Sequence, residues 1–158
     1  MTQSDDDPPR AARGLGGILR ALRRLRGRRP TDVATAMPLA QRSYEHFESG
    51  AARLNMERVI RFAEVTDTDG FAILAGLWMG SEAFALRCAD NKLMTILVMT
   101  LQDFDATTGD AIATLDAQTL VSAFEQAFAG LRDEARRRTA DGWLQDHAAR
   151  LPRGPRRS

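Results

Sequence analysis

Prolines and glycines confine two helices to very short lengths between residues 27 and 50, and this spacing constrains the fold more than any other feature of the sequence. Pro30 suits the first turn of a helix, because its ring fixes φ and its missing N–H would be unpaired there. Pro38 ends that helix by pushing the preceding residue out of the α region. A second short helix covers residues 41–49 and is terminated by Gly50. Both helices have an inward apolar side, formed by Val33, Ala34, Met37, Tyr44 and Phe47.

Further helices flank this pair. An apolar stripe with the spacing i, i+3, i+4, i+7 and i+10 predicts a helix that ends at Gly27. Asn55 can cap a fourth helix, and Thr68 or Asp69 can cap a fifth. No stretch alternates as a strand does, so the sequence predicts an all-α fold that opens with a five-helix lobe. The stripe of the first helix consists of Leu15, Ile18, Leu19, Leu22 and Leu25.

A second helical region is expected beyond Gly80. Ser81 can cap a long helix that reaches about Phe104 and is apolar on more than one face, so we expect it to be packed from two sides. Asp116 can cap a further long helix, and a short last helix surrounds Trp143. The helix after Asp116 carries a clear apolar stripe: Leu120, Val121, Phe124, Phe128 and Leu131.

These patterns divide the chain into four segments. A disordered acidic arm (1–12) precedes the five-helix lobe (13–79). A region of two long helices and one short helix (80–149) follows, and the chain finishes in a basic disordered tail (150–158). We predict that the third segment supplies dimerisation or partner binding.

Charge is distributed very unevenly along the chain. Residues 10–61 contain twelve arginines and four acidic residues, a net charge of +8, whereas residues 62–158 contain ten basic and fourteen acidic residues. A basic lobe followed by a mildly acidic one indicates a polyanion as the partner of the first and a different partner for the second. The alternative is a charged surface in an arginine-rich protein, since 21 of the 22 basic residues are arginine.

Residues 22–54 resemble, without a gap, the helix-turn-helix of the Cro/C1 (XRE) family of bacterial and phage regulators. The matching positions include Arg23, Gly27, the apolar-Ala pair at 33–34, Met37, Leu39, Tyr44, Phe47, Glu48 and Gly50. The resemblance extends over roughly residues 15–77. It implies that the first short helix crosses the DNA backbone while the second enters the major groove. The segment from Phe71 to Val98 also looks like stand-alone regulators of alphaproteobacteria.

The resemblance implies a role for each matching residue. The start and next outward turn of the second short helix would read bases, since Gln pairs with adenine, Arg with guanine and Glu with cytosine. Three arginines would contact phosphate instead of reading bases. The base-reading candidates are Gln41, Arg42, Ser43, Glu45 and His46, and the phosphate candidates are Arg28, Arg29 and Arg53. Each of them is otherwise simply a solvated residue.

The sequence departs from the family pattern at two positions. The family usually has a glycine in the turn and a polar residue at the start of the first short helix, where this chain has Pro38 and Pro30. One phosphate or base contact is therefore absent, and Arg28 or Arg29 would replace it. Arg23 and Glu48 match a family pair that forms a partly buried ion pair, so they are interpreted as structural.

No catalytic motif competes with this interpretation. The chain has two histidines, His46 and His147, and one cysteine, Cys88, and it has no glycine-rich phosphate loop. We expect no enzymatic activity, no cofactor and no metal site. The longest apolar run is too short to cross a bilayer, and nothing marks the chain for export, so a cytoplasmic, nucleoid-associated location is expected.

The leading hypothesis is a sequence-specific transcriptional regulator, activator or repressor, that binds double-stranded DNA as a homodimer. Its C-terminal helices would supply self-association or contact RNA polymerase or a second regulator. The alternative is a protein-interaction module, such as an antitoxin or adaptor, in which the DNA-binding lobe is secondary. The operator, the regulated genes and any effector do not follow from the sequence.

Overall fold

The computed structural model describes residues 10–148, and every regular element within that range is helical. The prediction of an all-α fold is confirmed. The elements in chain order are α1 (Arg10–Leu25), α2 (Pro30–Ala36), α3 (Gln41–Glu48), α4 (Met56–Thr66), α5 (Gly70–Met79), α6 (Glu82–Arg87), α7 (Leu93–Thr108), the 3₁₀ helix η1 (Gly109–Thr114) and α8 (Ala117–Ala148). The tail predicted at 150–158 lies outside the described residues, as does the arm predicted at 1–12 except for residues 10–12, which belong to α1.

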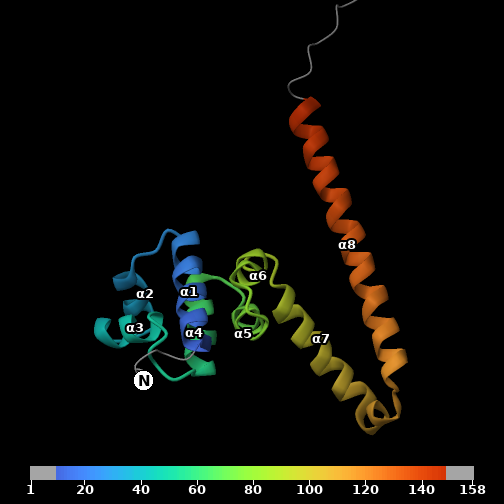
Figure 1. The fold of residues 1–158 in the computed structure, drawn as a ribbon, viewed down its shortest axis with the longest axis horizontal. Helices are drawn as coiled ribbons and strands as arrows, with labels where there is room; N and C mark the ends of the chain where they lie inside the picture. Colours follow the sequence, from blue (N-terminus) through green and yellow to red (C-terminus); the bar gives the residue numbers. More distant parts are fainter. Residues whose placement is uncertain (1–9, 149–158) are drawn as a thin grey trace, which may run out of the picture. The chain divides into compact units, whose positions relative to one another are not determined.

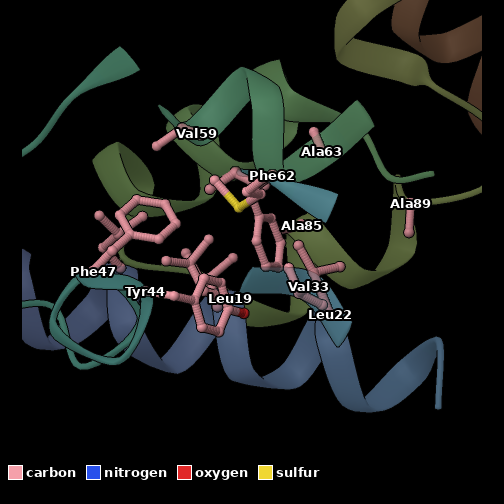
Figure 2. Close-up of a cluster of buried hydrophobic side chains, with 14 of the residues drawn as sticks. Leu19, Leu22, Val33, Tyr44, Phe47, Val59, Phe62, Ala63, Ala85 and Ala89 are labelled. Carbon is pink, nitrogen blue, oxygen red and sulfur yellow. The ribbon is translucent and has the colours of Figure 1, made fainter. Parts of the chain in front are cut away.

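Contacts between residues divide the chain into two units, with the division between Thr107 and Thr108. In the first unit α1 packs against α3, α5 and α6, while α4 packs against α2 and α5 (Figure 1). Side chains from these helices close one core, part of which Figure 2 shows. Its fully buried large members include Ile18, Leu19, Leu22, Val33, Tyr44, Phe47, Val59, Phe62 and Ile73.

Local side-chain caps fix where three of these helices begin. The Asn55 carboxamide oxygen accepts a hydrogen bond from the Arg58 N–H (3.0 Å) at the start of α4. The Ser81 hydroxyl accepts one from the Phe84 N–H (3.3 Å) at the start of α6. Both caps were predicted. Of the two candidates for α5, Asp69 is the cap, and it accepts from Ala72 N–H at 3.1 Å.

The first unit extends further than the predicted boundary between residues 79 and 80. Helix α6 packs on α1 and α5, with Ala85 buried inside the helix and Cys88 and Ala89 buried directly after it. A five-helix lobe would leave part of α1 and α5 in water, and α6 covers that surface because Gly80, with φ of 68°, reverses the chain.

Two predicted helices differ from those in the structure. The single helix expected from residue 81 to about 104 is interrupted between α6 and α7, where Lys92 has φ of 54° and the Asn91 side chain accepts from the Leu93 N–H at 3.0 Å. The short helix expected around Trp143 is instead the continuation of α8. Glu134 forms ion pairs with Arg137 and Arg138 across the charged run in α8, and i,i+3 and i,i+4 pairs favour an unbroken helix there.

Candidate nucleic-acid interface

Helices α2 and α3 form a tight pair joined by the turn between Met37 and Ala40. The Leu39 N–H donates to the Ala34 carbonyl oxygen (2.9 Å), which folds the chain back at the end of α2. On the inward side of α3, the ring of Phe47 lies 6.3 Å from that of Tyr44 and 6.3 Å from that of Phe62 in α4. Both α3 rings are buried (Figure 2), so α3 is fixed against the core along one side.

The opposite side of α3 lies in solvent. All five residues predicted to read bases are exposed, namely Gln41, Arg42, Ser43, Glu45 and His46. Within the described part of the chain, the Arg42 guanidinium forms no side-chain hydrogen bond or ion pair. The structure therefore presents a rigidly backed helix with a polar outer row of both donors and acceptors.

Two members of that row are already paired with each other. The Gln41 side-chain amide donates a hydrogen bond to Glu45 Oε1 at 2.9 Å. The sequence interpretation treated the two as separate readers, although their i,i+4 spacing was a signal for this contact. This contact uses one of the two N–H donors of the Gln41 amide, so the other N–H and the amide oxygen stay available for adenine.

The three arginines predicted to contact phosphate are all exposed, but they are not equivalent. Arg29 faces Asp32 with two parallel hydrogen bonds of 3.1 Å, and the Asp32 carboxylate also accepts from the Arg29 N–H at 3.2 Å. The hydrogen bond raises the pKa of Arg29 and lowers that of Asp32. The charge of Arg29 is thus partly compensated at the start of α2, whereas the side chains of Arg28 and Arg53 form no ion pair within the described residues, and Arg28 acts on Asp32 through its charge alone.

A buried polar cluster joins α1 to the end of α3. Arg23 Nε donates to Glu48 Oε1 at 2.5 Å, and Arg23 Nη2 donates to Glu48 Oε2 at 3.4 Å. The Tyr44 hydroxyl donates to the same Glu48 Oε1 at 3.1 Å. Arg23 and Glu48 are 8% and 7% exposed, so this pair faces the interior and not DNA. The sequence paired these two residues on resemblance, and the structure brings them into contact.

The electrostatics of this cluster follow from burial. The hydrogen bond to Glu48 raises the pKa of the Arg23 guanidinium. Burial raises the pKa of the Tyr44 hydroxyl, and the adjacent Glu48 carboxylate adds to the shift. Arg23 Nη1 also donates to the Arg28 carbonyl oxygen at 2.9 Å. The cluster therefore ties the segment before α2 to the last turn of α3.

Close backbone contact reinforces this link between α1 and α3. A Cβ atom added to Gly16 would lie 2.8 Å from the Glu48 carbonyl oxygen and 2.9 Å from Ser49 backbone atoms. Only glycine fits at that point without moving one of the two helices. The orientation of α3 is thus set by a glycine contact, an ion pair and two aromatic side chains.

One arginine of the basic segment has a role that the sequence did not indicate. Arg26 donates to the carbonyl oxygens of Thr66 (3.0 Å) and Asp67 (2.6 Å) at the end of α4, and to the Asp90 carboxylate (2.8 Å). Cations at a helix C-terminus satisfy carbonyls that lack an intrahelical partner. The charge count alone could not distinguish Arg26 from arginines available to a ligand.

The paired short helices, with a buried inner side and a polar outer row, define a helix-turn-helix protein. A family model described as a helix-turn-helix domain matches residues 15–71, so the chain contains this domain across α1 to the start of α5. Comparison with curated proteins and with solved structures finds no match. None of the described helices is long and apolar enough to span a membrane.

Proposed function

We propose that this protein is a sequence-specific transcriptional regulator of the Cro/C1 type that inserts α3 into the major groove of double-stranded DNA. The observation that carries the proposal is the division of α3 into a locked inner side and an exposed outer row. Base readout needs donors and acceptors held in a fixed register, because each base pair presents a fixed pattern in the major groove. Arg42 is the residue best placed to pair with guanine, since its guanidinium has no competing partner among the described residues.

Backbone contacts accompany this readout. Arg28 precedes α2 and Arg53 follows α3, so an exposed guanidinium is available to a phosphate on either side of the groove. Arg29 contributes once its pair with Asp32 exchanges for a phosphate. The activity proposed is binding alone, with no catalytic step and no cofactor, in the cytoplasm at the nucleoid.

We assign the C-terminal helices to self-association. Nine large apolar side chains of α7 and α8 are between 37% and 62% exposed in the single chain: Ile96, Leu97, Met99, Leu101, Phe104, Val121, Phe124, Phe128 and Leu131. Each leaves on the order of 100 Å² of its surface in water, which association with a partner would bury. A row of large apolar side chains exposed along a helix is typical of a protein–protein interaction site.

A second copy of the chain is the occupant that fits this surface. The spacing of Val121, Phe124, Phe128 and Leu131 is 3-4-3, the heptad pattern of helices that pair along a seam. Helix α7 has apolar residues on more than one face and buries none of its side chains. A single further helix of the same chain could cover one apolar face of α7 but not all of them. Two copies of the chain bring together two α7 and two α8 helices, which are enough to cover all these faces.

Selection from random duplex DNA tests the DNA-binding proposal. The full-length protein should enrich one short motif, present twice in inverted orientation because a two-fold dimer reads two equivalent half-sites. Enrichment of no motif, with binding that depends only on salt concentration, would overturn the proposal. Mapping of genomic binding sites together with transcription in a deletion strain then shows whether bound genes are activated or repressed.

Sedimentation equilibrium tests self-association. Phe128→Glu should convert the dimer to a monomer with unchanged helix content, because it places a charge in the apolar seam. Gln126→Glu is the matched control, because Gln126 is an exposed residue outside the stripe on the same helix. A wild-type chain that sediments as a monomer would contradict the dimer.

The same apolar surface supports a second candidate function, an antitoxin or adaptor that docks a different protein. In that case the partner protein, RNA polymerase or another regulator would bind α7 and α8 in place of a second copy of the chain. This second candidate predicts a monomer that protects a single half-site. It also predicts a partner protein whose binding does not displace DNA. The sedimentation experiment therefore separates the two candidates.

A further inference from the structure

The Asp69 carboxylate lies at the N-terminal ends of two different helices. Asp69 is 1% exposed. Its Oδ1 accepts from the Ala72 N–H of α5 (3.1 Å) and from the Thr95 hydroxyl of α7 (2.8 Å). Its Oδ2 accepts from the N–H groups of Met94 (2.8 Å) and Thr95 (3.2 Å), both in α7. One buried carboxylate therefore caps α5 and α7 together, and both its oxygens are fully used.

Two further contacts brace the same junction. Lys92, directly before α7, pairs with the Asp67 carboxylate at 2.9 Å. Arg26, directly after α1, reaches Asp90 in the segment between α6 and α7, as described above. Cys88 and Ala89, which begin that segment, are buried in the core of the lobe. The chain between α6 and α7 is thus held by two ion pairs and by two buried side chains.

This junction does not serve the packing of α7 itself. No side chain of α7 is buried, and the contacts that tie it to the lobe are concentrated at its first turn. A flexible linker would be enough to tether a dimerisation helix to a DNA-binding lobe. A fixed junction, unlike a flexible linker, sets the angle between α7 and α3, the helix that is proposed to enter the major groove.

We infer that Asp69 is a positioning residue: it fixes α7 relative to the DNA-binding lobe so that the dimer accepts one spacing between its two half-sites. The inference rests on the proposed function and on self-association through α7 and α8. Two rigidly mounted recognition helices match DNA at one separation along the duplex. Two tethered ones bind many separations with similar affinity, because a flexible connection lets each lobe reach its half-site.

Two variants loosen the junction without removing the α5 cap. Asp69→Asn keeps one oxygen, and Asn is as good an N-cap as Asp, but its amide nitrogen cannot accept from α7. Thr95→Val removes one α7 donor and leaves Asp69 intact, so it remains informative if the Asn variant fails to fold. Thr100→Val is the control, since the Thr100 hydroxyl bonds only to the Ile96 carbonyl within α7 (2.9 Å).

The first readout needs no DNA. Spin labels are attached at Thr35→Cys in α2 and Gln102→Cys in α7, both exposed positions, and the distance between the two labels is measured. The native cysteine is removed by Cys88→Ala, and the labelled protein is diluted with unlabelled protein so that only distances within one chain are recorded. A narrow distance distribution is expected for the unmodified junction and for Thr100→Val. It should broaden for Asp69→Asn and Thr95→Val. An equally narrow distribution in both variants would overturn the inference.

The second readout uses duplexes that carry two selected half-sites at centre-to-centre spacings varied in single base pairs. The wild-type protein should prefer one spacing by about tenfold or more over a spacing shifted by half a helical turn. In both junction variants this preference should largely disappear, with dimer mass and single half-site affinity unchanged. Retention of the wild-type spacing profile overturns the inference, as does a wild-type protein with no spacing preference. If the wild-type protein does not bind a single half-site, the proposed function is rejected. The distance measurement then still tests whether Asp69 fixes α7 relative to the lobe.

Discussion

Replacement of Glu48 by alanine should remove a large part of the stability of the DNA-binding lobe. The change deletes the acceptor of two hydrogen bonds from Arg23 and of one from the Tyr44 hydroxyl. Breaking a buried ion pair by removing one partner costs about 3–5 kcal/mol, since the other charge stays buried without compensation. The unpaired Tyr44 hydroxyl is part of that cost and is not added to it. In a lobe of this size the melting temperature should fall by roughly 15–30 °C.

Thermal unfolding followed by circular dichroism measures this effect, with binding to a selected duplex measured well below the melting temperature. Glu45→Ala is the matched control, because Glu45 is an exposed acid on the outer side of the same helix. Substitutions at such positions change stability by about 0.5 kcal/mol or less. The control should therefore melt close to the wild type, with altered sequence preference as its only consequence.

A compensating variant checks the physical reason. Combining Arg23→Met, Tyr44→Phe and Glu48→Leu removes the whole buried polar cluster, and replacing a buried pair by apolar residues of similar size is often neutral or stabilising. Most of the stability lost in Glu48→Ala should therefore return. The reasoning is refuted if Glu48→Ala melts within a few degrees of the wild type and loses DNA binding, because Glu48 would then act at the DNA surface.

Three further substitutions test the interface. Arg42→Ala should cost about 1–3 kcal/mol of binding free energy at one base position per half-site, seen as relaxed preference there in a repeated selection; equal weakening on all sequences would reduce Arg42 to a phosphate contact. Arg53→Ala should weaken specific and random duplexes alike and lower the salt slope of log K by about one, and an unchanged slope removes Arg53 from the backbone contacts. Gly16→Ala should destabilise the lobe by about 1–3 kcal/mol in chemical denaturation, because its methyl group meets the Glu48 backbone; an unchanged midpoint would show that α1 and α3 separate easily.

The sequence was enough to predict some features of the exposed side of α3 but not others. The outward position of Arg42 and Ser43 follows from helical periodicity, given that Tyr44 and Phe47 face inward. The bond between Gln41 and Glu45 also lies within reach of sequence reasoning, since residues four apart in a helix are neighbours. Which of these side chains is free for a ligand depends on rotamers, and periodicity does not determine rotamers.

The sequence by itself determined the helices and their limits in the first half of the chain. Pro30, Gly50 and the caps at Asn55 and Ser81 act on backbone groups within three or four residues, so their effect is readable from the order of residues alone. The same local logic missed the break near Lys92, because a left-handed backbone at a lysine is held by contacts formed elsewhere in the fold.

Only the tertiary structure decided what the charged residues do. Arg26 and Asp90 are 64 positions apart in sequence, and Asp69 reaches Thr95 across 26 positions. A carboxylate in a sequence shows its charge and its capacity to cap one helix, but a second helix becomes its partner only when the fold brings that helix alongside. Local interactions are set by chain geometry over a few residues, whereas these long-range pairs exist because the packing of α1, α4, α5 and α6 brings distant residues together. Around Asp69, which is 1% exposed, the packing also excludes water, so the carboxylate must bond to neighbouring protein groups.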